Sequence, residues 1–199
     1  MTLEQFLEWE KTQDRRHEFV DGVVRAMTGG TLRHNPITGN IQVALPMPAR
    51  TAGCRAHSSD VQVRTPGGRN YYPDVVVGCG PFAQRDRYAR SPCIVVEVTS
   101  PSTRSIDREE KLDAYRTISS VRAYRIVEQA VRRTKCHVQQ ENGTWTHFEA
   151  SDATGVGEFA PPCVDAVLTL DDVYADTDIL PPPDLRASVG RATDAEPTA

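Results

Sequence analysis

The sequence predicts a single α/β (α+β) domain in which strands dominate the second half of the chain. Some apolar residues recur at the three-to-four-residue spacing of a helix, and others form short β-branched runs bounded by Gly, Pro or Asn. The length of 199 residues suits one domain. We expect residues 1–176 to form it, and residues 177–199 to form a flexible, acidic, Pro/Ala-rich tail with too few large apolar residues to order.

The N-terminal part is predicted to contain a helix, a hairpin and a second helix. Thr2 and Gln5 form a capping-box pattern before a helix that we expect to end near Asp14. Asp21-Gly22 is typical of the tight turn between two short antiparallel strands. Apolar residues spaced by four predict a helix over residues 35–50, frayed where two prolines interrupt it.

The rest of the chain is predicted to hold strands around one further helix. That helix spans 105–118, with Asp107 as its cap and Glu110 three residues later. Asn142-Gly143 favours the turn of a C-terminal hairpin. The other predicted strands cover residues 56–64, 72–78, 93–99 and 123–129.

Cysteine usage and hydropathy point to a cytoplasmic protein without a membrane partner. The five cysteines form an odd set with no CxxC pair, so we expect free thiols in a reducing compartment. The N-terminus lacks the pattern of a secretory signal. No apolar run approaches the roughly 18 residues that suggest a membrane span.

The net charge of −4 is unfavourable for a phosphate-rich partner, but its distribution is uneven. Residues 176–199 hold five acids against two arginines. Residues 84–135 hold twelve Lys or Arg against seven Asp or Glu. This basic stretch is compatible with a phosphate ligand.

Two acids on consecutive predicted strands form the candidate site. Alternation along residues 93–99 places Glu97 among apolar residues, where an edge charge or a salt bridge to an arginine is the favoured explanation for the residue taken alone. Asp74 follows Pro73 at the start of an apolar strand, where turn chemistry alone could account for it. Antiparallel pairing would bring the acids together, and converging carboxylates repel unless they share a proton or a hard cation such as Mg²⁺ or Mn²⁺.

Lys111 and Glu18 are the further candidates. Lys111 is one of three lysines against twenty arginines, and it lies within helical reach of the two acids. Its ammonium could orient an attacking water or stabilise developing charge, although a solvated helix lysine is an equal alternative. Glu18 begins the first hairpin and could add a carboxylate from an N-terminal element.

Other motifs carry less weight. Cys54 and His57 have a spacing that could bind zinc, but no second suitable pair follows. His34-Asn35 near a helix start is more typical of a cap. Neither a phosphate loop nor a GxSxG setting is present.

These residues resemble the Uma-two family of restriction-endonuclease-like proteins, in the PD-(D/E)XK nuclease superfamily. The resemblance covers roughly residues 3–174, and its specific part lies between Pro73 and Tyr115. It rests on the segments HEFVDG (17–22), YPDVVV (72–77), IVVEVTSPST (94–103), Asp107, EKL (110–112) and YR (115–116).

The resemblance implies a mixed β-sheet flanked by helices, with Asp74 and Glu97 as Mg²⁺ or Mn²⁺ ligands and Glu18 as an auxiliary acid. It implies an endonuclease-like hydrolase that acts on nucleic acid, with DNA as the expected polymer, and a homodimer. The superfamily's lysine usually stands two residues after the glutamate, where this chain has Thr99, so Lys111 is expected to replace it. Arg125 stands where relatives often have an aromatic residue.

Two other functions fit the same pattern. A non-catalytic nucleic-acid-binding or assembly protein could retain the nuclease fold as a scaffold, since fold does not fix function. A metal-dependent hydrolase of smaller phosphate esters is the other alternative. Metal binding without cleavage would favour the first, and release of phosphate from nucleotide monophosphates would favour the second.

Overall fold

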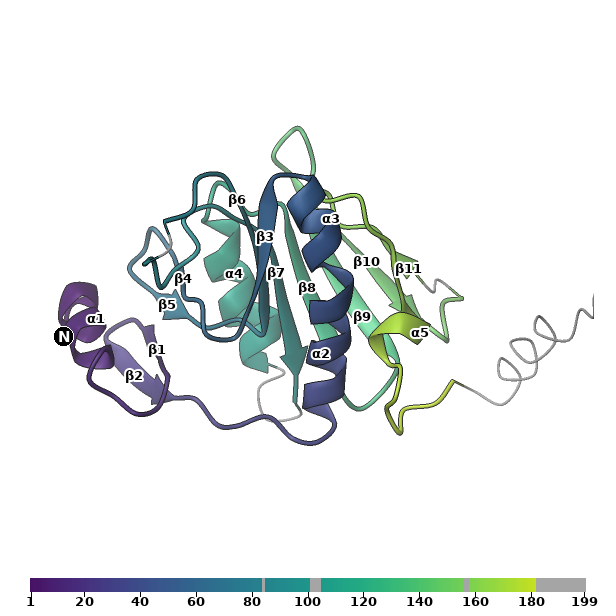
Figure 1. Cartoon of the computed structure of the whole chain (residues 1–199), viewed down its shortest axis with the longest axis horizontal. Coiled ribbons are helices and arrows are strands. Elements are labelled where there is room, and N and C mark those ends of the chain that lie inside the picture. Colours follow the sequence, from purple (N-terminus) through teal and green to yellow (C-terminus); the bar gives the residue numbers. More distant parts are fainter. Residues whose placement is uncertain (84, 101–104, 156–157, 182–199) are drawn as a thin grey trace, which may run out of the picture.

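The computed structural model describes residues 1–83, 85–100, 105–155 and 158–181 (Figure 1). Its helical elements are α1 (Leu3–Glu10), α2 (His34–Ala44), α3 (Pro46–Thr51), the π-helical turn η1 (Ile106–Glu110), α4 (Lys111–Arg116) and α5 (Leu170–Val173). Its strands are β1 (His17–Val20), β2 (Val23–Ala26), β3 (Cys54–Ser58), β4 (Val63–Arg64), β5 (Asn70–Tyr71), β6 (Val75–Cys79), β7 (Pro92–Thr99), β8 (Ala123–Glu128), β9 (Arg133–Gln139), β10 (Trp145–Ser151), β11 (Glu158–Phe159) and β12 (Leu168–Thr169).

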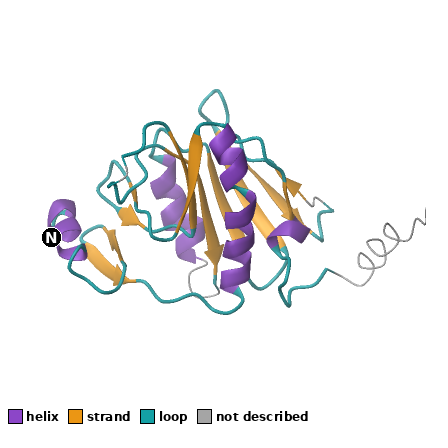
Figure 2. Cartoon of the chain, viewed as in Figure 1, coloured by secondary structure: helices purple, strands orange, loops and turns teal. Residues whose placement is uncertain are grey.

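The centre of the fold is a six-stranded sheet in the order β10-β9-β8-β7-β6-β3. Its strands are drawn in orange in Figure 2, with purple helices in front of and behind them. β7 and β8 are parallel, and the other neighbouring pairs are antiparallel. A parallel pair needs a crossover connection, and η1 with α4 supplies it between β7 and β8. The sheet is therefore mixed, as expected.

Helices cover both faces of this sheet. α2 and α3 cross one face, whereas α4 lies behind the sheet in the same view (Figure 1). Alternation along β7 divides its side chains between two cores: Val96 joins the core with α2 and α5, and Val95 joins the core with α4. The fold class, a mixed sheet flanked by helices, is confirmed.

A smaller sheet in the order β2-β1-β5-β4 adjoins the α4 side. Its hairpin turns at Asp21 and Gly22, whose φ angles of 50° and 86° are those the predicted tight turn requires. Val20, Val63 and Tyr71 from this sheet pack into the same core as α4. This packing brings the N-terminal hairpin to the face of the central sheet that carries α4.

Several predicted boundaries differ in the structure. The first helix has the predicted capping box but ends at Glu10, and the predicted helix over 35–50 is two helices, with Pro46 starting the second. The strand predicted over 56–64 is β3 and β4, which belong to different sheets. Asp107 is not a side-chain cap, because it lies inside η1. The structure adds β11, β12 and α5, which the sequence pattern did not indicate.

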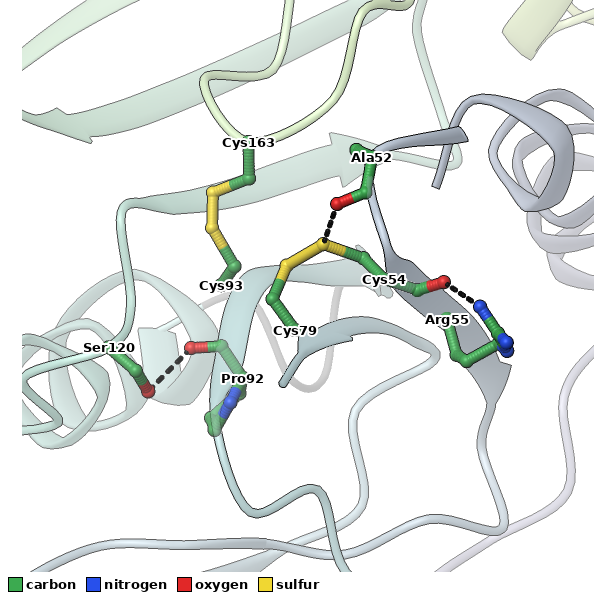
Figure 3. Close-up of a disulfide and its surroundings, with 8 residues drawn as sticks. All are labelled: Ala52, Cys54, Arg55, Cys79, Pro92, Cys93, Ser120 and Cys163. Atoms are coloured by element: carbon green, nitrogen blue, oxygen red, sulfur yellow. Dashed lines mark hydrogen bonds between the residues drawn. A yellow bond between two sulfur atoms is a disulfide. The ribbon is translucent and has the colours of Figure 1, made fainter. Parts of the chain in front are cut away.

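The expectation of free thiols is wrong for four of the five cysteines. Cys54 bonds to Cys79 and Cys93 bonds to Cys163, whereas Cys136 is free and buried (Figure 3). Cys54 and Cys79 face each other in the β3–β6 ladder, a proximity that sequence spacing cannot reveal. Because disulfides persist mainly in oxidising compartments, these cysteines do not support a cytoplasmic location.

The start of the predicted tail contacts the domain. The Thr177 hydroxyl donates to the Tyr174 carbonyl at 2.7 Å, Arg33 Nε donates to Asp178 at 2.9 Å, and Ile179 packs on the core. Residues 182–199 lie outside the described part of the chain. None of the described helices has the length and apolar character needed to cross a membrane.

Candidate active site

Strand pairing brings Asp74 and Glu97 together. β6 and β7 are antiparallel with Val75 opposite Val96, so one step further along the register places Asp74 opposite Glu97, on the same face. The backbone N–H of Val98 donates to Asp74 Oδ2 at 2.7 Å, which fixes the carboxylate against β7. The expected convergence of the two acids is present.

Lys111 completes the predicted set from the helix that covers this face. Its Nζ lies 3.0 Å from Glu97 Oε1, 3.1 Å from Glu18 Oε1 and 3.4 Å from Asp107 Oδ1. The side chain is 8% exposed, so the alternative of a solvated helix lysine is wrong. Glu18, Asp74, Glu97, Asp107 and Lys111 are called the carboxylate–lysine cluster below.

Glu18 reaches the cluster because the N-terminal hairpin is attached to η1. Glu18 lies on β1 opposite Arg25 of β2. Arg25 Nη1 donates to both carboxylate oxygens of Glu110 at 2.9 Å. The hairpin and η1 are therefore held side by side, with Glu18 directed at Lys111.

Asp107 is a cluster member that the sequence pattern assigned to a different role. η1 is a π-helical turn immediately before α4, and such turns are frequent at functional sites. The Tyr124 hydroxyl donates to the Asp107 carbonyl at 2.8 Å, which anchors the turn to β8. The available signal was position: Asp107 stands four residues before Lys111, a spacing that places two helical side chains on one face.

His34 and Tyr115 also contact the acids, and the sequence analysis missed both. His34 Nε2 lies 3.2 Å from Asp74 Oδ1, and the Tyr115 hydroxyl donates to Glu97 Oε1 at 3.0 Å. The hydrogen bond to Asp74 raises the pKa of His34, despite an opposing effect of burial. His34 thus acts on Asp74 rather than as a helix cap. The position of Tyr115, one helical turn after Lys111, could have indicated that the two side chains lie on the same helical face.

The cluster carries excess negative charge in a buried place. Burial raises the pKa of Glu97 well above its usual range; Lys111 opposes this, and the carboxylates of Asp107, Asp74 and Glu18 add to it. Burial lowers the pKa of Lys111, but the carboxylates of Glu97, Glu18 and Asp107 outweigh that effect and raise it overall. Three carboxylates surround the single lysine, so negative charge exceeds positive charge in the cluster. Lys111 is therefore an ammonium ion at neutral pH.

Comparison with known proteins identifies the family of the chain. A model of the Uma2 family, described as "Putative restriction endonuclease", matches residues 3–163. The chain belongs to the Uma2 family. The Synechocystis sp. protein slr1290 is 32% identical over 156 residues, which cover 76% of this chain and 82% of that protein. The Synechocystis sp. protein sll1609 is 25% identical over 164 residues, covering 80% of this chain and 93% of that protein.

A solved structure shows the same fold. The crystal structure of a putative nuclease belonging to DUF820 from Anabaena variabilis superposes with a TM-score of 0.69 at 14% identity. The match covers 88% of this chain and 98% of that chain. At this identity the likeness concerns the fold.

Thr99 and Arg125 are the two positions at which this Uma2 chain departs from the expected pattern, and the structure explains both. Thr99 is buried, and its hydroxyl donates to the Ser100 carbonyl at 3.2 Å; the ammonium beside Glu97 comes instead from Lys111 on α4. Arg125 stands beside Val96 in the β7–β8 ladder, so it projects from the face opposite to Glu97. The substitution at Arg125 therefore does not shape the site directly.

In the Uma2 site, the donors that could bind a divalent cation are the carboxylates of Asp74 and Glu97. Among the residues that the structure describes, no three or more His, Cys, Asp or Glu side chains are grouped so that they could hold a metal ion. Mg²⁺ is commonly bound through one or two carboxylates, with water and substrate phosphate completing its shell. The opposed carboxylates of Asp74 and Glu97, in a cluster with excess negative charge, fit this mode.

Proposed function

We propose that this Uma2 protein is an Mg²⁺- or Mn²⁺-dependent endonuclease that hydrolyses phosphodiester bonds of nucleic acid, with DNA as the preferred polymer. The proposal rests above all on one observation: Lys111 Nζ lies 3.0 Å from Glu97, beside the Asp74–Glu97 pair. An acid pair with an adjacent buried ammonium is suited to phosphoryl chemistry, which needs positive charge near the phosphate oxygens. The family match and the nuclease-like fold support the same reaction class.

Asp74 and Glu97 would hold the cation. When bound, the cation would polarise a phosphate oxygen and lower the pKa of a water molecule. The chain already orients both carboxylates: the Val98 N–H and His34 fix Asp74, and Tyr115 fixes Glu97. These contacts reduce the reorganisation needed when a cation and substrate bind.

In the resting protein, Lys111 contributes a positive charge and does not act as a proton acceptor. Its raised pKa keeps the ammonium protonated, so Nζ can donate to a substrate phosphate oxygen or orient a water molecule. Glu18 and Asp107 hold this ammonium from two sides, at 3.1 and 3.4 Å. Glu18 is thus proposed as an auxiliary acid that positions Lys111.

Cleavage assays with matched variants test the proposal. Purified wild type is incubated with supercoiled DNA, single-stranded DNA and RNA, in Mg²⁺, Mn²⁺ or EDTA. The variants are Asp74→Asn, Glu97→Gln and Lys111→Ala, and Asp113→Asn is the control. Asp113 is an exposed acid two residues after Lys111, so its loss changes the charge of α4 without touching the cluster.

The proposal predicts metal-dependent cleavage by wild type and Asp113→Asn, and a loss of at least about 100-fold in the three cluster variants. Equal cleavage by all proteins would assign the activity to a contaminant. Metal binding without cleavage of any polymer would favour a non-catalytic nucleic-acid-binding protein, and release of phosphate from nucleotide monophosphates alone would favour a small-ester hydrolase. We also propose that the protein is a homodimer. Light scattering tests this, and a monomeric mass would contradict it.

A further inference from the structure

A cavity lies at the opposite end of β6 from Asp74. It has a volume of about 830 Å³, and its lining includes Gly78 and Cys79 at the end of the strand. Five residues of extended strand separate Asp74 from Cys79, which corresponds to roughly 16 Å. The cavity is therefore separate from the carboxylate–lysine cluster.

Cationic and aromatic side chains are prominent in the lining of this cavity. Six of them, called the arginine pocket below, are Arg50, Arg55, His57, Phe82, Tyr88 and Arg90. The one acid of the lining, Asp86, is paired with Arg90 through a hydrogen bond of 3.1 Å. Arg50 and Arg55 form no salt bridge with any residue that the structure describes, so their charges are available to an anion.

Phe82 supplies an exposed ring next to these charges. Phe82 is 45% exposed, so its ring is accessible to a ligand. The Arg55 guanidinium lies 5.3 Å from the ring centroid, and the His57 ring lies 6.2 Å from it. The chain can turn over the sheet here because Gly80, with φ of 108°, adopts a conformation that other residues avoid.

The disulfide between Cys54 and Cys79 forms part of this region. It joins β3 to β6, and Cys79 itself lines the cavity (Figure 3). Arg55 follows Cys54 directly, and its Nη1 donates to the Cys54 carbonyl at 2.8 Å (Figure 3). The covalent link therefore fixes the backbone from which Arg55 projects.

We infer that the arginine pocket binds a nucleotide unit of single-stranded nucleic acid, with the phosphate at Arg50 and Arg55 and the base against Phe82. Arginine suits phosphate because of its planar fork of donors, and aromatic rings stack on bases without regard to sequence. In a duplex the faces of the bases are stacked on one another, so a pocket of this kind selects unpaired nucleotides. This inference does not depend on the cleavage proposed above.

Binding in EDTA tests the inference without cleavage. Fluorescence anisotropy is measured with a labelled oligothymidylate of about 12 nucleotides and with a duplex of the same length. The variants are Arg50→Gln/Arg55→Gln and Phe82→Ala. The control Lys11→Gln/Arg15→Gln removes the same net charge from exposed positions outside the pocket.

We expect each pocket variant to weaken binding of the single strand about tenfold or more, and the control to weaken it less than about threefold. Equal weakening by pocket and control variants would overturn the inference, as would equal affinity for duplex and single strand. Binding of AMP as tight as that of the oligonucleotide would assign the pocket to a free nucleotide instead of a strand. Asp113→Asn, outside both the pocket and the carboxylate–lysine cluster, should retain binding. Because the assay runs in EDTA, failure here is distinguishable from failure of the nuclease proposal.

Discussion

Lys111 Nζ lies 3.0 Å from Glu97 Oε1, and both side chains are buried between α4 and the central sheet. Two further carboxylates contact the same ammonium. The pair is thus one part of a cluster whose charges do not cancel. The predictions below follow from this imbalance and from the contacts that hold it in place.

Replacement of Lys111 by Met should impair both stability and activity. The change leaves the carboxylates of Glu18, Glu97 and Asp107 without their shared cation, and loss of one partner of a buried ion pair commonly costs about 3–5 kcal/mol. Urea unfolding should show a lower free energy of unfolding of that order. An unchanged free energy of unfolding would mean that these carboxylates are protonated or hydrated in solution.

Replacement of Glu97 by Gln should have opposite effects on stability and on activity. Without a metal, the neutral amide relieves repulsion among buried carboxylates, so the free energy of unfolding should rise by about 1 kcal/mol at pH 8 while cleavage is lost. The variant and wild type are compared by urea unfolding in EDTA. A variant that is markedly less stable than wild type would contradict the excess negative charge.

The raised pKa of Glu97 also predicts that the stability of the protein depends on pH. A carboxyl whose pKa is raised on folding binds its proton more tightly in the folded state, so its contribution to stability is present below about pH 4.5 and is lost as pH rises toward the folded pKa. In EDTA, the free energy of unfolding of wild type relative to Glu97→Gln should therefore fall between pH 5 and pH 8. A difference that stays constant with pH would show that Glu97 does not titrate there.

His34 is expected to act as a positioning residue for Asp74. Its Nε2 lies 3.2 Å from Asp74 Oδ1, and contacts that orient a metal ligand commonly change metal affinity or activity by about 10–100-fold. His34→Ala should raise the Mn²⁺ concentration needed for half-maximal cleavage by at least about tenfold, with little change in KM for DNA. An unchanged metal requirement would limit His34 to packing.

Reduction of the disulfides should destabilise the domain. Cys93–Cys163 closes a loop of 70 residues, and a cross-link of this kind typically contributes about 2–4 kcal/mol. Thermal melting with and without dithiothreitol measures the effect, and non-reducing mass spectrometry counts the thiols. Five free thiols in protein purified without reductant would contradict both pairings.

The sequence was informative where local patterns and strand register were sufficient. Asp74 and Glu97 stand on consecutive strands, and antiparallel pairing of such strands is common enough to predict their meeting. Lys111 followed from its place on the next helix. Glu18 came from a distant hairpin, and the position that Arg25 and Glu110 give it could be seen only in three dimensions.

The remaining features depend on long-range packing. His34 contacts Asp74 because α2 crosses the end of β6. The sequence around His34 contains no pattern that predicts this crossing. Asp107 was misassigned because its three-residue spacing from Glu110 matches a capping box, whereas the structure places it inside a π-helical turn. The cysteine pairs were missed for a related reason, since spacing does not determine connectivity.

A crystal of the protein soaked in Mn²⁺ tests the central claim most directly, because the anomalous signal locates the ion without any assumption about substrate. The account predicts one ion within roughly 2.0–2.6 Å of carboxylate oxygens from both Asp74 and Glu97, with Lys111 alongside. No ion at this position under conditions in which the same protein cleaves DNA, or an ion bound elsewhere in the fold, would contradict it.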